Sequence, residues 1–142
     1  MGFLQAEDVL LPARFLTLTS HLVVTLCIVL DLDRTAARIS TPSESPEDVL
    51  RVLEPLAYTA LGSLLFEVIG LFTGATIFQR GLSCIYIVLH FIGTILVGLL
   101  IEQYWSLDAY IVIFTVFNAL PCVLEMMFGT FYLRGRLMEY RK

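Results

Sequence analysis

Charged residues are scarce in this chain. Of its 142 residues only 15% are charged and 58% are hydrophobic, whereas a soluble domain usually carries about 25% charged residues. The few charges also avoid four long apolar stretches that make up most of the sequence. An ordinary soluble domain is therefore excluded, and the sequence predicts a polytopic membrane protein.

Features typical of other protein classes are missing as well. The net charge of -4 provides no basic surface for nucleic acid, so no nucleic-acid partner is expected. Asn118 is the only asparagine in the sequence, and no glycosylation sequon exists. The three cysteines, Cys27, Cys84 and Cys122, lie inside apolar stretches and lack the paired spacing of a disulfide framework or a metal site.

Motifs that carry catalysis are also absent. The sequence contains no glycine-rich phosphate loop, no nucleophile elbow and no metalloprotease motif. We therefore expect a non-enzymatic protein without a resident cofactor or metal. The first residues lack the positive region and the small-residue cleavage site of a signal peptide, so no removable leader is expected.

The four apolar stretches are long enough to cross a bilayer as helices. At about 1.5 Å per residue, some twenty residues cover the ~30 Å hydrocarbon core. The spans are expected at residues 12–32, 56–78, 82–101 and 109–133, within one membrane domain that covers 1–142. The predicted fold class is all-α, a four-transmembrane-helix bundle.

The long connection at 33–55 is acidic and contains a helix-start signal. Ser45-Pro46, followed by two acidic residues, combines an N-cap, a first-turn proline and negative charge at the positive end of the helix dipole. Apolar residues then recur at helical spacing. The sequence predicts a short amphipathic helix on the membrane surface, with Pro55 bending the chain into the next span.

Each predicted span carries one ionisable side chain within its apolar length. A charged group at membrane depth costs about 2.5–3.5 kcal/mol on insertion scales, so each of these groups needs a partner. We expect a buried polar cluster of His21, Glu67, His90, Asn118 and Glu125. Within it, we predict that Glu125 pairs with His90 or His21, and that Glu67 lies nearer the edge.

Small residues and a proline share the helix faces of these ionisable residues. Gly70 and Gly74 form a GxxxG pattern, which lets another helix approach closely. The predicted helix-packing positions are Ser63, Gly70, Gly74, Gly98, Pro121 and Gly129. Anchors at the membrane interface are expected where an arginine can snorkel or aromatic residues form a belt. These anchors are Arg14, Tyr104, Trp105 and Tyr110.

The distribution of basic residues predicts the orientation. Six basic residues fall on the side of the two termini, and three fall on the other side, within the loop 33–55. Because basic residues concentrate in cytoplasmic segments, both termini are expected in the cytoplasm.

The buried ionisable residues admit three interpretations. They could form a hydrogen-bonded plug that fixes how the helices pack. They could instead serve a small proton-linked transporter or channel built around His21, Glu67, His90 and Glu125, which would need a hydrated path to both faces. A third possibility is a haem- or metal-binding redox protein, since imidazole and carboxylate groups suit zinc or iron.

At these positions the chain resembles the transmembrane protein 107 family, four-span proteins of the ciliary transition zone. The residues that carry the resemblance touch all four predicted spans. They are Pro12-Ala13-Arg14-Phe15-Leu16-Thr17-Leu18, His21-Leu22-Val23-Val24, Glu67, Gly70, His90, Glu102, Trp105, Ala119-Leu120-Pro121 and Glu125-Met126.

The resemblance implies a scaffold or membrane anchor without catalytic residues. Its implied partners are other transition-zone membrane proteins, tectonic- and meckelin-like, and soluble proteins with C2-like domains. Such a protein would help assemble the Meckel-syndrome module at the base of the cilium. It would thereby affect ciliary membrane composition, cilium formation and Hedgehog signalling.

Overall fold

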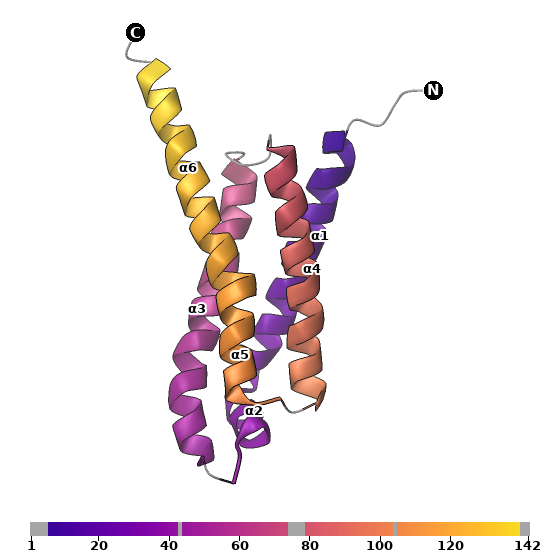
Figure 1. Ribbon diagram of the computed structural model, residues 1–142, viewed down its shortest axis with the longest axis vertical. Coiled ribbons are helices and arrows are strands. Elements are labelled where there is room, and N and C mark those ends of the chain that lie inside the picture. The colour runs from indigo at the N-terminus through magenta and orange to yellow at the C-terminus, as the bar shows by residue number, and fades with distance from the viewer. Residues whose placement is uncertain (1–5, 43, 74–78, 104, 140–142) are drawn as a thin grey trace.

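Four long helical rods run side by side and form the molecule (Figure 1). The computed structural model describes residues 6–42, 44–73, 79–103 and 105–139. The first three rods are α1 (Ala6–Leu30), α3 (Pro46–Thr73) and α4 (Arg80–Gln103). The fourth is built in sequence from α5 (Leu107–Phe114), a π-helical turn (Thr115–Ala119) and α6 (Leu120–Glu139). A short helix, α2 (Leu32–Ile39), lies between α1 and α3.

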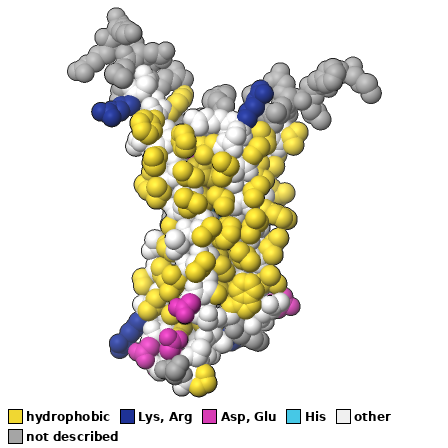
Figure 2. Space-filling view, viewed as in Figure 1, with side chains coloured by type: hydrophobic (Ala, Val, Ile, Leu, Met, Phe, Trp, Pro, Cys, Tyr) yellow, Lys and Arg dark blue, Asp and Glu magenta, His cyan; other side chains and the backbone are white. Residues whose placement is uncertain are grey.

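The start of α1 and the end of α6 lie at the same end of the bundle, which we call the terminal end (Figure 1). The opposite end carries α2 and is called the loop end. Hydrophobic side chains cover the middle of the molecule, and charged side chains gather towards its two ends (Figure 2). This distribution is the one that a bilayer requires.

The described residues contain four stretches long and apolar enough to cross a membrane: Val9–Leu30, Pro46–Thr73, Arg80–Gln103 and Leu107–Tyr132. The described part of the chain is otherwise helical with short connections and contains no strand. The prediction of an all-α bundle of four membrane helices is therefore confirmed.

The helix-start signal at Ser45 and Pro46 works as predicted, but the helix does not stop at Pro55. Ser45 Oγ accepts a hydrogen bond from the backbone N–H of Asp48 at 3.2 Å, and α3 then continues to Thr73. The buried residues of α3 keep helical spacing on both sides of the proline: Val49, Leu53, Ala57, Ala60, Leu64, Glu67 and Leu71. Continuous packing along this face outweighs the single backbone hydrogen bond that a proline removes.

The short amphipathic helix of the first loop is therefore α2 and not the segment before Pro55. It buries Thr35, Ala36 and Ile39 and packs against α3. Its basic residues, Arg34 and Arg38, are exposed. The helix thus covers the loop end of the bundle with its apolar face turned inwards.

An apolar core fills the loop half of the bundle, beside α2. Its buried members are Ile28, Ala36, Ile39, Val49, Leu53, Ala57, Val97, Leu100, Tyr110 and Ile113. Tyr110 is only 2% exposed, so its predicted role as an interface anchor is wrong. Tyr110 lies on the buried face of α5 together with Ile113, so its ring packs into the core.

The fourth rod widens just before Pro121. The backbone N–H of Leu120 bonds to the carbonyl of Thr115, five residues earlier. In a regular α-helix the proline ring would clash with the carbonyl of Phe117, and a π-helical turn relieves such crowding. Beyond this turn, α6 leans away from the other helices towards the terminal end (Figure 1).

Candidate functional site

In the interior nearer the terminal end, ionisable side chains are buried among leucines such as Leu18, Leu64 and Leu71. We call these ionisable side chains the polar cluster, and each of its members is at most 3% exposed. The members are Arg14 and His21 on α1, Glu67 on α3, Tyr86 and His90 on α4, and Glu125 on α6. All four membrane spans therefore contribute to one buried site.

Arg14 and Glu125 form a buried ion pair. Arg14 Nη2 lies 2.9 Å from Glu125 Oε2, and both side chains are 2% exposed. The guanidinium carbon also lies 4.2 Å from the centre of the Tyr86 ring, a cation–π geometry. The predictions that Arg14 snorkels to the interface and that Glu125 pairs with a histidine are therefore wrong. A permanently charged guanidinium is the stronger partner for a buried carboxylate.

A second set of contacts joins Glu67, His90 and His21. His90 Nε2 lies 2.9 Å from Glu67 Oε2, and His90 Nδ1 lies 3.2 Å from His21 Nδ1. The Tyr86 ring stacks on the His90 ring with centroids 6.2 Å apart. His90 is thus the central residue that links α1, α3 and α4, and Glu67 stands at one end of this chain of contacts.

The proton positions in this chain of hydrogen bonds are interdependent. If Glu67 is ionised, His90 donates from Nε2 and must accept at Nδ1 from His21. If Glu67 is protonated, it donates to His90 Nε2, and His90 then donates from Nδ1 to His21. Either arrangement satisfies both contacts without a charged imidazole.

Two glycines let these side chains approach the neighbouring helices. A Cβ on Gly70 would lie 3.0 Å from Glu125 Cδ, so Glu125 packs directly on the backbone of α3. A Cβ on Gly93 would lie 2.6 Å from His21 Cε1 and 2.9 Å from Phe117 Cβ. Gly93 was not among the predicted packing positions, although it lies three residues after His90 on the same helix face.

The other predicted packing positions differ in their surroundings. Ser63 is half-buried, and its hydroxyl donates to the carbonyl of Ala60 at 2.8 Å. Pro121 is buried, and its carbonyl accepts a long hydrogen bond of 3.5 Å from Tyr86. A Cβ on Gly98 or Gly129 would meet nothing within 4 Å, so neither glycine serves close helix packing.

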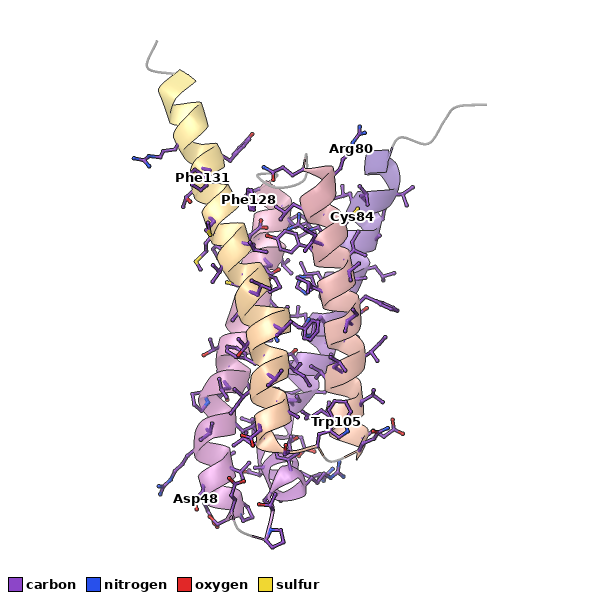
Figure 3. All side chains as sticks on the ribbon, in the orientation of Figure 1. Asp48, Arg80, Cys84, Trp105, Phe128 and Phe131 are labelled. Carbon is purple, nitrogen blue, oxygen red and sulfur yellow. The ribbon has the colours of Figure 1, made fainter. Side chains whose placement is uncertain are left out.

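The reasons for these two errors are geometric. Gly98 follows the buried Val97 and is turned out of the buried face of α4. Gly129 lies one turn after Glu125 on α6 and lines an open groove beside α3. Gly74 and Tyr104 lie outside the described residues. Trp105, partly exposed, lies at the loop end (Figure 3) and donates to Gln103 Oε1 at 3.2 Å.

Comparison with known proteins places this architecture in a family. A family model named TMEM107 and described as a transmembrane protein matches residues 10–128. The chain belongs to the transmembrane protein 107 family. This stretch contains all six residues of the polar cluster and part of every span.

Several relatives align along most of their lengths. Transmembrane protein 107 of Homo sapiens is 31% identical over 121 residues, which cover 82% of this chain and 86% of the relative. The protein of the same name from Danio rerio is 28% identical over 82% of this chain and 89% of its own. That of Xenopus laevis is 27% identical over 87% and 91%. No solved structure matches the chain.

Asn118, predicted as a cluster member, is buried in the π-helical turn and 2% exposed. Its Oδ1 atom has no hydrogen-bond partner among the described residues, and neither do Thr25 Oγ1 and His21 Nε2. The hydrogen-bonded chain from Glu67 therefore ends at His21 within the described part of the protein.

The residues that sequence reasoning missed carry recognisable signals. Arg14 lies seven residues before His21, which places both on one face of a helix, and Thr25 continues that face. Tyr86 lies four residues before His90 and shares its face in the same way. A buried Glu125 needs a positively charged partner, and this requirement could have identified Arg14 as that partner.

The geometry of the two histidines does not match that of a haem held between them. Their Nδ1 atoms are in direct hydrogen-bond contact at 3.2 Å, so the rings face each other rather than opposite sides of a porphyrin. Within the described residues, no group of three or more His, Cys, Asp or Glu side chains is placed to hold a metal ion. The contacts that the structure shows are hydrogen bonds and an ion pair among the side chains of the cluster itself.

Proposed function

We propose that this protein is a non-enzymatic membrane scaffold of the ciliary transition zone. In this role it helps assemble the Meckel-syndrome module, with tectonic- and meckelin-like membrane proteins and soluble C2-like-domain proteins as partners. It thereby influences ciliary membrane composition, cilium formation and Hedgehog signalling. Membership of the transmembrane protein 107 family supports this proposal.

The observation that carries the proposal is the linkage of all four spans by the polar cluster. Buried polar groups specify helix register, because only one arrangement brings Arg14 to Glu125 and His90 to both Glu67 and His21. Such a bundle presents its outer faces in fixed positions. A scaffold needs this property, because its partners must bind to surfaces that do not rearrange.

Large apolar side chains project from every span towards the surroundings of the bundle. One exposed example from each rod is Leu16 at 66%, Ile69 at 61%, Phe91 at 56% and Val112 at 61%. In a membrane these faces contact lipid or the spans of other proteins, where association depends on close packing. They are therefore the surfaces that we assign to membrane partners.

The orientation with both termini in the cytoplasm forms part of the proposal. Arg14 is buried and ion-paired, so it no longer counts as a loop charge. Five basic residues still remain on the terminal side, against three in the loop 33–55. The Ser43→Asn change creates a glycosylation sequon in that loop, and glycosylation there, but not at a sequon appended after Lys142, is the expected result.

A proton-linked transporter is the alternative function that the cluster raises. Transport requires a hydrated path that reaches both faces of the membrane. The hydrogen-bonded chain ends at His21, and Ile28, Leu53 and Leu100, each at most 1% exposed, fill the interior towards the loop end. The described interior therefore favours the scaffold.

Affinity purification from ciliated cells tests the proposal. The tagged full chain, extracted in mild detergent, should recover tectonic- and meckelin-like proteins by mass spectrometry, and imaging should place it at the transition zone. An absorbance scan of the same sample should lack a Soret band. A coloured protein, or one that recovers none of these partners, would contradict the proposal.

A pair of matched variants connects partner recovery with the cluster. Glu125→Gln removes the negative charge that faces Arg14 and should lower recovery of the membrane partners. Glu102→Gln changes an exposed carboxylate at the end of α4 and should leave recovery unchanged. Equal recovery with both variants would show that partner binding does not depend on the buried ion pair.

A further inference from the structure

A groove opens between α3 and α6 where α6 leans away from the bundle. Its volume is about 360 Å³, and its walls include Phe66, Gly70 and Thr73 on α3 with Met126, Gly129 and Thr130 on α6. Small ligand sites usually begin near 300 Å³. Because the groove lies within two membrane spans, its natural environment is the hydrocarbon of one leaflet.

The lining is apolar although it contains polar residue types. The Thr73 hydroxyl donates to the carbonyl of Gly70 at 2.8 Å, and the Thr130 hydroxyl donates to the carbonyl of Met127 at 2.8 Å. Both threonines therefore direct their hydroxyls to their own helices. Glu125, at the inner end, is paired with Arg14. The groove consequently offers a surface for hydrocarbon rather than for a polar ligand.

The shape of the groove suits a flexible occupant. An acyl chain can follow an irregular apolar groove between two helices, and the charge at the outer end of the groove identifies what such a chain would belong to.

The length of the groove and the charge beside its outer end indicate which lipid binds there. Glu125 and Arg134 are nine residues apart on α6, which corresponds to about 13.5 Å, close to half of the ~30 Å hydrocarbon core. Arg134 is exposed and lies two residues beyond the apolar span that ends at Tyr132. A positive side chain thus stands at headgroup level, one helical turn beyond Thr130 of the groove.

From these observations we infer that the α3–α6 groove binds one acyl chain of an anionic phospholipid, whose headgroup lies beside Arg134. The site belongs to the leaflet on the side of the terminal end. It is separate from the scaffold role proposed above, because it requires neither a protein partner nor a cilium.

Native mass spectrometry of the purified full chain tests this inference. The protein is reconstituted in nanodiscs of phosphatidylcholine and phosphatidylserine in equal amounts, released gently, and its retained phospholipids are counted and identified. The wild type should retain one phospholipid and favour phosphatidylserine. A wild type that retains none, or that shows no preference between the two lipids, would overturn the inference.

Gly129→Leu is the decisive variant, since a Cβ there meets nothing within 4 Å and the side chain would fill the groove without a clash. It should lose the retained phospholipid. The control is Gly98→Leu, whose Cβ is equally unobstructed but lies on α4, away from the groove; it should retain the phospholipid. If the two variants behave alike, the groove is not the site.

Arg134→Gln tests the headgroup contact separately from the groove. The variant should still retain a phospholipid, but its preference for phosphatidylserine over phosphatidylcholine should fall about fivefold. An unchanged preference would contradict the role of Arg134. If Gly129→Leu keeps its phospholipid and instead loses a co-purifying membrane protein, the groove holds a partner helix and the lipid assignment is wrong.

Discussion

The two halves of the bundle differ in their interiors. The loop half is filled by ten buried, mostly aliphatic residues, two of them on α2, whereas the interior nearer the terminal end holds an ion pair and a chain of hydrogen-bonded ionisable groups among buried leucines. In a bilayer, lipid tails are as apolar as leucine, so apolar contacts alone provide little preference for one helix arrangement. Polar contacts need particular partners at particular distances.

The two halves therefore perform different tasks. The apolar half supplies tight packing and closes the bundle beside the first loop. The polar half determines which helix faces meet, because a misplaced helix would leave Arg14 or Glu125 as an unpaired charge in hydrocarbon. The effects of substitutions on stability should therefore differ in magnitude between the two halves, and they should also combine differently.

The largest effect is expected from Arg14→Leu. Removing one partner of a buried ion pair leaves the other charge unpaired, which costs about 3–5 kcal/mol of unfolding free energy. The control is Arg34→Leu, which removes an ion pair with Asp31 at the loop end; that pair is 3.4 Å long, and its side chains are 67% and 49% exposed. This variant should lose less than about 1 kcal/mol. Unfolding in mixed micelles measures the stability of both variants. Equal losses of unfolding free energy would contradict the proposed difference between the halves.

Leu53→Ala should give the next largest loss, in the apolar half. Leu53 is fully buried in the core, and truncating a buried leucine typically costs about 2–5 kcal/mol because a cavity remains. We expect the lower end of this range, since in the membrane only the packing contacts are lost. The same unfolding measurement checks the variant. A loss below about 0.5 kcal/mol would indicate that the loop half is loosely packed.

Gly93→Ala should destabilise by about 1–3 kcal/mol through overpacking. Its added methyl group would meet His21 and Phe117, which are held in place within the bundle. Gly98→Ala on the same helix meets nothing and should instead stabilise by up to about 1 kcal/mol through helix propensity. Opposite signs in the two unfolding measurements are expected. If Gly93→Ala were stabilising, there would have to be free space beside His21 that the structure does not show.

The smallest effect is expected from Thr25→Val. The hydroxyl of Thr25 is buried without a hydrogen-bond partner among the described residues, so an apolar side chain of the same shape removes an unsatisfied group. Stability should change by less than about 0.5 kcal/mol or rise slightly. A loss above about 1 kcal/mol would indicate an internal water bound at this hydroxyl, which would extend the polar half towards the loop end.

The sequence predicts the four spans well because hydropathy is a local property of the chain. It also selects His21, Glu67, His90 and Glu125 as buried, since an ionisable residue in an apolar stretch stands out. Which of these buried side chains contact one another could not be derived in the same way. Arg14 and Glu125 are 111 residues apart, and a charge near the start of a span fits a snorkelling side chain equally well.

Errors at individual helix positions have the same origin. Proline at position 55 suggests by local rules that a short helix ends there, but burial on both sides keeps α3 continuous. Gly98 and Gly129 have the residue type of packing positions, yet only the tertiary arrangement shows that they face open space while Gly93 meets a side chain. Residue type indicates what a position allows, and the neighbouring helix decides whether that property is used.

A double-variant cycle between Arg14 and Glu125 tests most directly whether the polar cluster sets the arrangement of the helices. Arg14→Met, Glu125→Leu and the combined variant would be compared with the wild type by unfolding in mixed micelles. We predict a coupling energy of about 2–3 kcal/mol, with the combined variant more stable than the sum of the single losses implies. Additive losses would show that the two residues do not act as a pair, and would contradict a role of the polar cluster in setting the helix arrangement.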